Sequence, residues 1–370
     1  MNSSKFTTRV NEKIGPSVCE TIRSMPDVDS CYATGSIVAG LGTSTSDIDL
    51  IVLARDSQAK LNFNDTLQGL VQAPRLDVEI YSRDEFGEFI ECCSRYDVTA
   101  GRSDRLYRIV HPLKILRQLS SGCHVIKDSP AFQAFHSRII RIRPMLRRLA
   151  LAQAVVFGAN TQEDLLGFLA DGDPIGSLRR SHDLLEFGLD ALCIARDQLY
   201  PDERMKWLWR RLLMTGLDDA RLAWLERLYV PETSPADDLL PWRRLDVSQG
   251  LLAEAMVACW SPSNALTLST PGVVDHQASN RLWRSPQWYL TRTDDEWLLA
   301  CADDAYSVPI TSAYAWARAS SSTREALARD VVEGLVIAGT ELRRDTASRV
   351  IGAMEKMGAL VHSDTFDGGR

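Results

Sequence analysis

The stretch GSIVAGLGTSTSDIDLIVL, residues 35–53, decides the fold of this chain. Its second half, DIDLIVL, is short and almost entirely apolar, which is typical of a buried β-strand. Asp47 and Asp49 interrupt this strand two positions apart, and such residues point to the same face of a strand. The two carboxylates therefore project side by side, about 7 Å apart at their Cα atoms. Ile48, Leu50 and Val52 point the other way, into a core.

Two like charges on one face of a buried strand are unfavourable unless a cation lies between them. Carboxylate oxygens are hard ligands of the kind that Mg²⁺ prefers. Asp77 interrupts a second strand pattern, LDVEIY at residues 76–81, and a neighbouring strand would bring it beside Asp47 and Asp49. Glu79 shares the face of Asp77 and is the alternative third ligand. The sequence thus predicts a site for one or two Mg²⁺ ions.

A phosphate-binding segment is predicted directly before this strand. Gly35 and Ser36 follow a short strand pattern at residues 30–34. Glycine lets a backbone approach phosphates closely, and the backbone N–H groups at the start of a helix form an anion site. Ser36 adds a hydroxyl donor. Ser46 precedes the first aspartate and can orient a carboxylate or contact a phosphate.

Three carboxylates on Mg²⁺ beside a phosphate segment make up the arrangement that nucleotidyl transfer needs. One metal ion lowers the pKa of the attacking hydroxyl, and the other neutralises the triphosphate and the leaving pyrophosphate. The third carboxylate, Asp77, is also placed to take the proton of the hydroxyl.

The spacing of these residues resembles a known superfamily. Gly-Ser, ten further residues, Asp-Ile-Asp-Leu and a later Leu-Asp-Val-Glu-Ile strand look like the DNA polymerase β-like nucleotidyltransferases. Within that superfamily the chain is most similar to small-molecule, aminoglycoside-type adenylyltransferases. The motifs span residues 35–81, and the general pattern continues to about residue 130. The resemblance implies that Asp47, Asp49 and Asp77 bind metal and that Gly35 and Ser36 hold the triphosphate.

A later segment extends this resemblance. Tyr200-Pro201 followed by Met205-Lys206-Trp207-Leu208 is similar to a segment whose lysine approaches the nucleotide phosphates. The resemblance therefore implies that Lys206 is a phosphate contact. Aminoglycoside-type enzymes are shorter, however, and have no obvious equivalent of residues 270–370. An antibiotic-resistance role is not implied for this chain.

We expect an α+β protein with three domains. Residues 1–130 alternate helix and strand patterns and form the nucleotidyltransferase domain, a mixed sheet with helices. Residues 131–270 carry helical periodicity and form a bundle that acts as the substrate domain. Residues 280–365 form a small α+β domain that resembles winged-helix or peptide-binding modules and could dock a protein or peptide partner. The expected helices include 61–71, 83–95, 104–119, 313–319, 322–338 and 344–357, with strands at 124–126, 288–290 and 297–300, and with a kink at Pro144.

Composition sets the class of protein. The chain has 370 residues, a formal net charge of −7 and eight scattered cysteines without a C-x-x-C pair. A general DNA-binding protein usually carries the opposite charge, so a nucleic-acid partner is not favoured. The sequence contains no run of about 18 apolar residues, so no membrane span is predicted. Residues 1–13 lack the apolar core of a signal peptide. We expect a cytoplasmic protein with reduced, mostly buried thiols.

Three other features are interpreted as structural. Acidic residues share one helix face at positions 183, 186 and 190, and a solvated face is a simpler explanation than a wall for a cationic acceptor. The arginines at 138, 141, 143, 147 and 148 are expected to pair with acids rather than to bind a triphosphate or RNA. His111 is expected to be structural, since the proposed chemistry needs no imidazole.

The function expected from the sequence is Mg²⁺-dependent transfer of a nucleoside monophosphate, AMP from ATP, to a hydroxyl of a small acceptor. The acceptor is expected to be antibiotic-like or natural-product-like. Two alternatives stay open. The acceptor could be a tRNA or a protein, as in toxin-like members of the superfamily, or the chain could be a catalytically silent nucleotide-binding scaffold.

Overall fold

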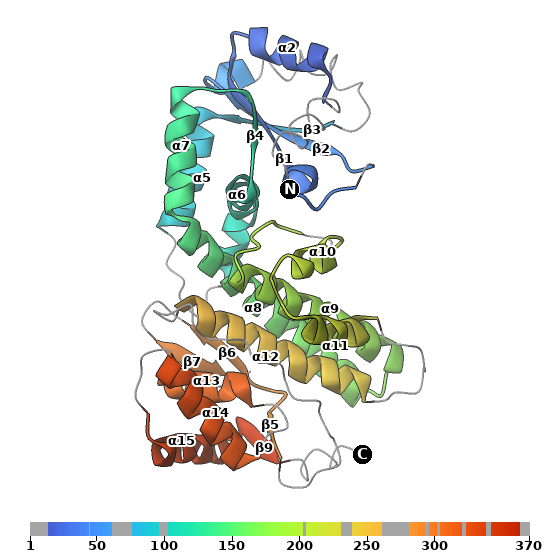
Figure 1. The fold of residues 1–370 in the computed structure, drawn as a ribbon, viewed down its shortest axis with the longest axis vertical. Coiled ribbons are helices and arrows are strands. Elements are labelled where there is room, and N and C mark those ends of the chain that lie inside the picture. The colour runs from blue at the N-terminus through green and yellow to red at the C-terminus, as the bar shows by residue number, and fades with distance from the viewer. Residues whose placement is uncertain are drawn as a thin grey trace. The chain divides into compact units, whose positions relative to one another are not determined.

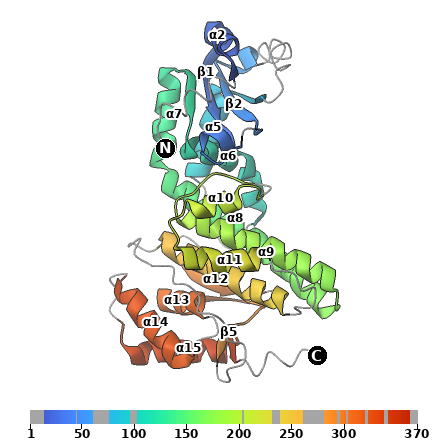
Figure 2. The ribbon, with the colours of Figure 1, turned by 45° about the vertical axis from the view of Figure 1, so that its right-hand side comes forward.

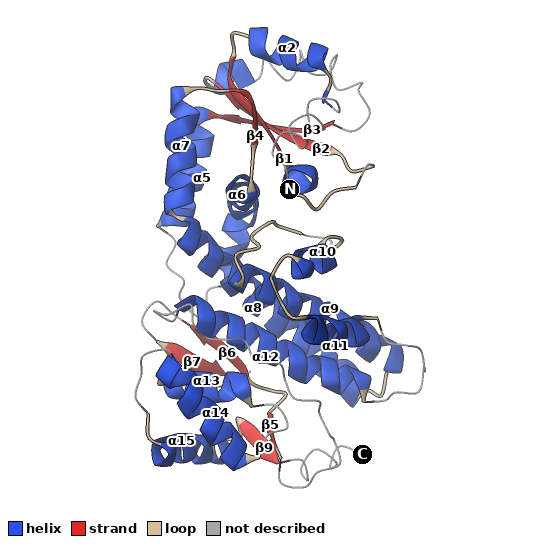
Figure 3. Ribbon diagram, in the orientation of Figure 1, coloured by secondary structure: helices blue, strands red, loops and turns tan. Residues whose placement is uncertain are grey.

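The computed structural model describes residues 14–43, 45–60, 76–95, 103–202, 205–230, 239–260, 281–292, 296–301, 304–319, 323–337 and 342–362. The chain is a mixed α+β protein, as expected, and Figure 3 shows its helices and strands. It divides into two compact units. Described residues up to 95, from 104 to 149 and from 198 to 211 belong to unit 1, and those from 150 to 197 and from 212 to 362 belong to unit 2. The three-domain division stays a prediction.

Unit 1 is built on a four-stranded mixed sheet in the order β3-β2-β1-β4 (Figure 1). Its strands are β1 (Val28–Thr34), β2 (Ile48–Ala54), β3 (Leu76–Ser82) and β4 (His124–Lys127). β1 runs antiparallel to both β2 and β4, whereas β2 and β3 run parallel. The strand patterns seen in the sequence are confirmed, with ends that differ by one or two residues. One such difference matters, because Asp47 lies directly before β2 and not inside it.

The alternation of β2 sorts its residues between two faces. Ile48, Leu50 and Val52 are almost fully buried in a core with α2 (Pro16–Ser24) and β1. Asp49 lies between these residues in sequence, so it points to the opposite face. The sequence predicted this division, and its physical reason is the burial of the three aliphatic side chains.

The helices of unit 1 have recognisable start signals. α5 (Arg83–Ser94) begins with a capping box, in which Ser82 and Glu85 satisfy each other's backbone N–H groups. α7 (Pro130–Arg141) begins after Ser129, whose hydroxyl accepts a hydrogen bond from the Phe132 N–H. α3 (Gly35–Val38) is a single turn, and α6 (Ser103–Ser121) is long. The helix expected at residues 61–71 lies outside the described residues.

The expected kink at Pro144 is wrong. α7 ends at Arg141, and a new helix, α8 (Arg143–Ala170), begins two residues later. Pro144 therefore lies in the first turn of α8. A proline is tolerated there because the N–H that it lacks has no partner within the helix.

Unit 2 contains most of α8 together with α9 (Pro174–Ala195), α11 (Asp219–Tyr229) and α12 (Leu240–Trp260). α9 and α12 pack along each other (Figure 2). Leu185, Leu189 and Leu192 of α9 are fully buried. Gly188 allows the close approach, because a Cβ at this position would lie 3.0 Å from the Cα atom of Ser248 on α12. The short helix α10 (Leu208–Leu213) lies at the boundary between the units along the chain.

The C-terminal part of unit 2 combines two small sheets with three helices. β6 (Tyr289–Arg292), β7 (Trp297–Ala300) and β8 (Ala305–Val308) form an antiparallel sheet, and β5 (Leu282–Arg284) pairs with β9 (Leu360–His362). The helices are α13 (Ile310–Arg318), α14 (Arg324–Ile337) and α15 (Arg344–Lys356). The three helices and the β6–β7 pair match the sequence-based expectation, whereas β5, β8 and β9 were not predicted.

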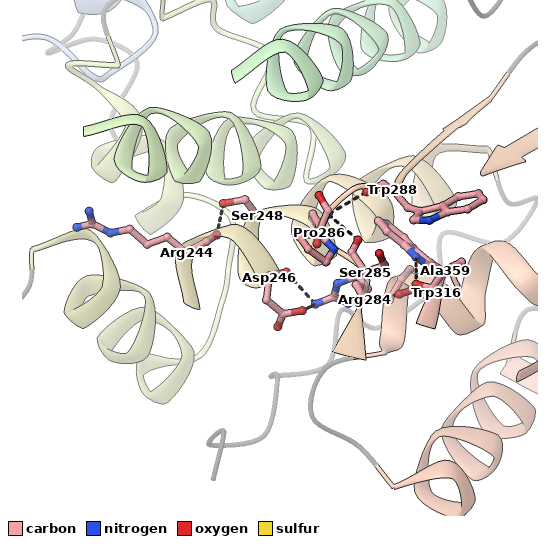
Figure 4. A network of polar contacts seen from close by, with 11 residues as sticks. Arg244, Asp246, Ser248, Arg284, Ser285, Pro286, Trp288, Trp316 and Ala359 are labelled. Atoms are coloured by element: carbon pink, nitrogen blue, oxygen red, sulfur yellow. Dashed lines mark hydrogen bonds and ion pairs between the residues drawn. The ribbon is translucent and has the colours of Figure 1, made fainter. Parts of the chain in front are cut away.

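A buried polar network joins this part to α12 (Figure 4). Arg284 of β5 donates to the backbone oxygen of Asp246 at 2.8 Å and to its carboxylate at 2.9 Å. It also donates to the carbonyl of Ala317 on α13 at 3.0 Å. The Arg284 side chain is only 2% exposed, so pairing with Asp246 offsets the cost of removing its charge from water. A single arginine thus ties β5, α12 and α13 together.

The structure also bears on two expectations from composition. No helix in the described part of the chain is both long and apolar enough to cross a membrane. All eight cysteines are free thiols, and five of them are buried, as expected.

Candidate functional site

The three aspartates singled out in the sequence lie together in one pocket of unit 1. The pocket has a volume of about 520 Å³, and all of its lining residues belong to unit 1. Besides Asp47, Asp49 and Asp77, the lining comprises Ser36, Thr43, Thr45, Ser46, Lys114, Gln118, Tyr200, Pro201, Asp202, Lys206 and Trp207.

Strand pairing explains how two of the aspartates meet. In the parallel register of β2 and β3, Asp49 is the direct partner of Asp77. Asp47 joins them from the residue before β2. The structure therefore brings together the three carboxylates that the sequence predicted, although they come from segments about thirty residues apart.

The electrostatics of Asp49 reflect this crowding. The pKa of the Asp49 carboxyl is raised to about 6, first by burial and then by the negative charges of Asp77, Glu79 and Asp47. Lys114 acts in the opposite direction. The ionised form of Asp49 is thus costly in this structure because it is partly removed from water and because the like charges around it are only partly balanced.

Gly35 makes room for this carboxylate. The residue has a φ of 86°, and a Cβ at this position would lie 1.6 Å from Oδ2 of Asp49. Its N–H donates to the hydroxyl of Thr34 at 2.5 Å. In this structure Gly35 therefore contributes to the site by having no side chain, which leaves room for the Asp49 carboxylate.

Hydroxyl groups form the wall next to Asp47. Ser36 is buried and lines the pocket together with Thr43, Thr45 and Ser46. The Ser46 hydroxyl accepts a hydrogen bond from the Thr43 N–H at 2.9 Å and lies 3.2 Å from the Thr43 hydroxyl. These contacts hold the loop, and they place four hydroxyl groups where a polyanion would find hydrogen-bond donors.

Lys206 reaches the pocket from a segment that lies far along the chain. This segment, residues 198–211, belongs to unit 1 although both of its flanks in sequence belong to unit 2. Arg117 on α6 donates to the carbonyl of Leu199 at 2.9 Å, and Arg210 donates to the carbonyls of Leu41 and Gly42 at 2.5 and 3.2 Å. These bonds attach the segment to the sheet side of the site, next to the hydroxyl-rich loop.

Sequence reasoning did not single out eight of the fourteen lining residues, among them Lys114, Gln118 and Tyr200. Lys114 and Gln118 lie one turn apart on α6. Gln118 hydrogen-bonds the hydroxyl of Tyr200, whose pKa is raised by burial and by the charges of Asp49 and Asp202. The i, i+4 spacing of Lys114 and Gln118 was the only local signal, and it is too common to identify a site.

The alternative third carboxylate, Glu79, is not among the described residues that line the pocket. Its Oε2 accepts a hydrogen bond of 2.5 Å from the hydroxyl of Tyr81, and its Oε1 lies 4.0 Å from Nζ of Lys114. Asp77, and not Glu79, therefore faces the pocket.

Some residues of the three features interpreted as structural have partners within the protein. Asp183 pairs with Arg180 at 3.2 Å, and Glu186 accepts a hydrogen bond of 2.8 Å from Tyr229. In the arginine cluster, Arg138 pairs with Glu91. His111 lies 2.9 Å from the Tyr81 hydroxyl and does not line the pocket.

The carboxylates share a pocket without being grouped as metal ligands. Among the described residues, no three His, Cys, Asp or Glu side chains are arranged closely enough to hold one metal ion. The donor set itself, three carboxylates and several hydroxyls, has the hard oxygen chemistry that suits Mg²⁺.

Comparison with family models and with curated proteins gives no family for this chain. No protein-family model matches it, and a search of curated proteins finds no match. The class of protein is therefore inferred from the pocket and its motifs.

Proposed function

We propose that this protein is a Mg²⁺-dependent nucleotidyltransferase of the DNA polymerase β-like kind. It would transfer AMP from ATP to a hydroxyl of a small-molecule acceptor and release pyrophosphate. One observation carries the proposal. Three aspartates at the ends of two neighbouring strands share a pocket with a hydroxyl-rich loop and with Lys206. The choice of ATP follows from the resemblance of residues 35–81 to aminoglycoside-type adenylyltransferases.

The residues that would hold the metal are Asp47, Asp49 and Asp77. Partial burial of several like charges is unfavourable by itself, and the raised pKa of Asp49 is the mark of that imbalance. A divalent cation among these oxygens would relieve it. When bound, Mg²⁺ supplies charge neutralisation for the triphosphate and a lowered pKa for the attacking hydroxyl.

The other pocket residues would serve the nucleotide. Ser36 and Ser46 offer hydroxyl donors to phosphate oxygens, and Lys206 offers a positive charge on the same pocket wall as Trp207. The Arg210 hydrogen bonds to Leu41 and Gly42 would keep the lysine segment and the loop together while substrate is held.

Asp77 would act as the proton acceptor. In the proposed step, the acceptor oxygen forms a bond to the α-phosphorus, the bond from that phosphorus to the bridging oxygen breaks, and pyrophosphate leaves. The hydroxyl proton passes to the Asp77 carboxylate. Asp77 fits this role better than Glu79, because Glu79 is already engaged by Tyr81 and Lys114.

The lining of the pocket favours a small acceptor. Its volume of about 520 Å³ lies in the range of small-molecule sites. Its described lining holds four acidic residues, Asp47, Asp49, Asp77 and Asp202, and two basic ones, Lys114 and Lys206. A polyanionic acceptor such as tRNA would gain little from this balance.

A pyrophosphate-release assay tests the proposal. The protein is incubated with Mg²⁺ and each NTP, with and without fractionated cell extract, beside Asp47→Ala/Asp49→Ala and the control Asp84→Ala. Asp84 is an exposed acid on α5, outside the pocket. We expect release that requires ATP and an extract fraction, is lost in the double variant and persists in the control. Full release by a folded double variant would overturn the proposal.

A further inference from the structure

Glu79 occupies an unexpected place for an acid so close to the site. It lies two residues after Asp77 on β3, on the same face of the strand. Its carboxylate is nonetheless held outside the pocket lining. One oxygen accepts from Tyr81, and the other faces Lys114.

Tyr81 fixes Glu79 from the protein side. Tyr81 is 7% exposed, and its ring packs against Phe86 and Phe89 with centroid distances of 6.4 and 5.1 Å. Its hydroxyl proton is donated to Glu79, so its lone pair accepts the N–H of His111 Nε2 at 2.9 Å. An apolar core and a hydrogen bond thus set the position of the Glu79 carboxylate.

Lys114 connects this carboxylate to the pocket. It projects from α6 and lines the pocket with Asp49 and Asp77, while its Nζ lies 4.0 Å from Glu79. Its positive charge lowers the pKa of Asp49, against the effect of the surrounding acids. Lys114 therefore offsets the same negative charges that a divalent cation would offset.

We propose that Glu79 and Lys114 form a charge-balanced pair that sets the divalent-cation affinity of the site. Lys114 is a positioning residue whose ammonium competes with the metal ion for the aspartate charges. Glu79 is not a metal ligand and counteracts Lys114. This inference rests on the proposed function, since it assumes that Asp47, Asp49 and Asp77 are the ligands.

Simple electrostatics gives the expected effects. Removing one nearby positive charge from a divalent-cation site should tighten binding about three- to tenfold, and removing one nearby negative charge should weaken it by about the same factor. Removing both members of a balanced pair should leave the affinity within about twofold of the wild-type value. Removing a true ligand should weaken binding much more, and no change at Lys114 should restore it.

Isothermal titration with Mn²⁺ tests the inference on the full chain. The variants are Lys114→Met, Lys114→Arg, Glu79→Gln, Glu79→Gln/Lys114→Met and the ligand variant Asp49→Asn. We expect tighter binding for Lys114→Met, unchanged binding for Lys114→Arg, weaker binding for Glu79→Gln and near wild-type binding for the double variant. Lys60→Met is the matched control, because Lys60 pairs with Glu85 at 2.7 Å outside the pocket lining. Circular dichroism verifies that each variant is folded.

Two outcomes would overturn the inference alone. Unchanged Mn²⁺ affinity in Lys114→Met would show that the ammonium does not compete with the metal. A double variant as weak as Asp49→Asn would show that Glu79 is itself a ligand. Failure of the wild-type protein to bind Mn²⁺, with and without ATP, would overturn the proposed function and this inference with it.

Discussion

Asp49 and Asp77 are direct partners in the parallel register of β2 and β3, so two carboxylates lie side by side at the wall of one pocket. Neighbouring strands place partnered side chains within about 5 Å of each other. Like charges opposite each other destabilise a sheet, and Asp49 is also buried enough for its pKa to reach about 6. The pair therefore destabilises this part of the sheet, and a cation bound between the two carboxylates would offset that destabilisation.

This cost predicts a stabilised but inactive variant. In EDTA, Asp49→Asn should raise the free energy of unfolding by about 1–2 kcal/mol, because it removes a charge that is both desolvated and repelled. Mg²⁺ should raise the melting temperature of the wild-type protein and leave that of the variant unchanged. Thermal unfolding with EDTA and with Mg²⁺ measures both effects. A variant that is less stable than wild type in EDTA would contradict this view of the site.

Gly35 and Gly40 offer a matched pair of substitutions. Both have positive φ, 86° and 76°, so alanine is strained at either position by about 1 kcal/mol. Only Gly35 lies against Asp49, whereas a Cβ at Gly40 meets nothing within 4 Å. Gly35→Ala should therefore cost at least about 2 kcal/mol more than Gly40→Ala in denaturant unfolding. In an Asp49→Ala background the difference should shrink, and an unchanged difference would locate the clash elsewhere.

The carboxylates of the site could be predicted from the sequence. Asp47, Asp49 and Asp77 interrupt apolar strand patterns, and a buried strand leaves few explanations for a charge. The short spacing from Gly35 adds a second, independent signal. The structure adds a reason for glycine at position 35 that the sequence did not show. A larger residue there would collide with the Asp49 carboxylate.

The places of Lys114 and Tyr200 in the pocket could not be predicted, because tertiary contacts set them. Lys114 lies on a helix without local distinction, and Tyr200 belongs to a segment that reaches the pocket only through bonds such as that from Arg117 to Leu199. The same limit explains β5 and β9. Each has three residues, and they pair across almost eighty residues of chain, so neither has a periodicity of its own.

From the contacts of Asp29 we predict part of the loss of stability of unit 1 in acid. Burial by itself raises the pKa of Asp29, but hydrogen bonds from Arg83 and Ser129 outweigh burial and hold the pKa below its ordinary value of 3.8. A carboxyl whose pKa is lower in the folded state stabilises the protein above the unfolded-state pKa. That contribution is lost as the pH falls through the folded-state pKa.

Asp29→Asn should therefore lower the free energy of unfolding by about 2 kcal/mol at pH 7. Its stability should also fall less steeply than that of wild type as the pH falls below about 4. Urea unfolding at pH 7 and at a series of acidic pH values measures both quantities. Exposed Asp84 is the control, and Asp84→Asn should follow the wild-type curve. Parallel curves for Asp29→Asn and wild type would show that the Arg83 and Ser129 contacts do not lower this pKa.

From the contacts of Arg210 we predict that its substitution lowers the affinity for nucleotide and leaves the stability of the protein almost unchanged. Its guanidinium donates to the carbonyls of Leu41 and Gly42 and lies 5.4 Å from the ring centroid of Trp207. Arg210→Met removes the two hydrogen bonds and keeps an apolar side chain beside the indole. Because the arginine is exposed, the free energy of unfolding should change by less than about 0.5 kcal/mol.

The loop that carries Thr43 and Ser46 would lose its attachment to the Lys206 segment, so nucleotide should bind less well. We expect the KM for ATP, or its dissociation constant from titration, to rise about three- to tenfold. The exposed Arg227 of α11 gives the control, because Arg227→Met lies in unit 2 and should change neither quantity. An Arg210→Met protein with wild-type ATP affinity would show that the loop and the lysine segment hold their positions independently.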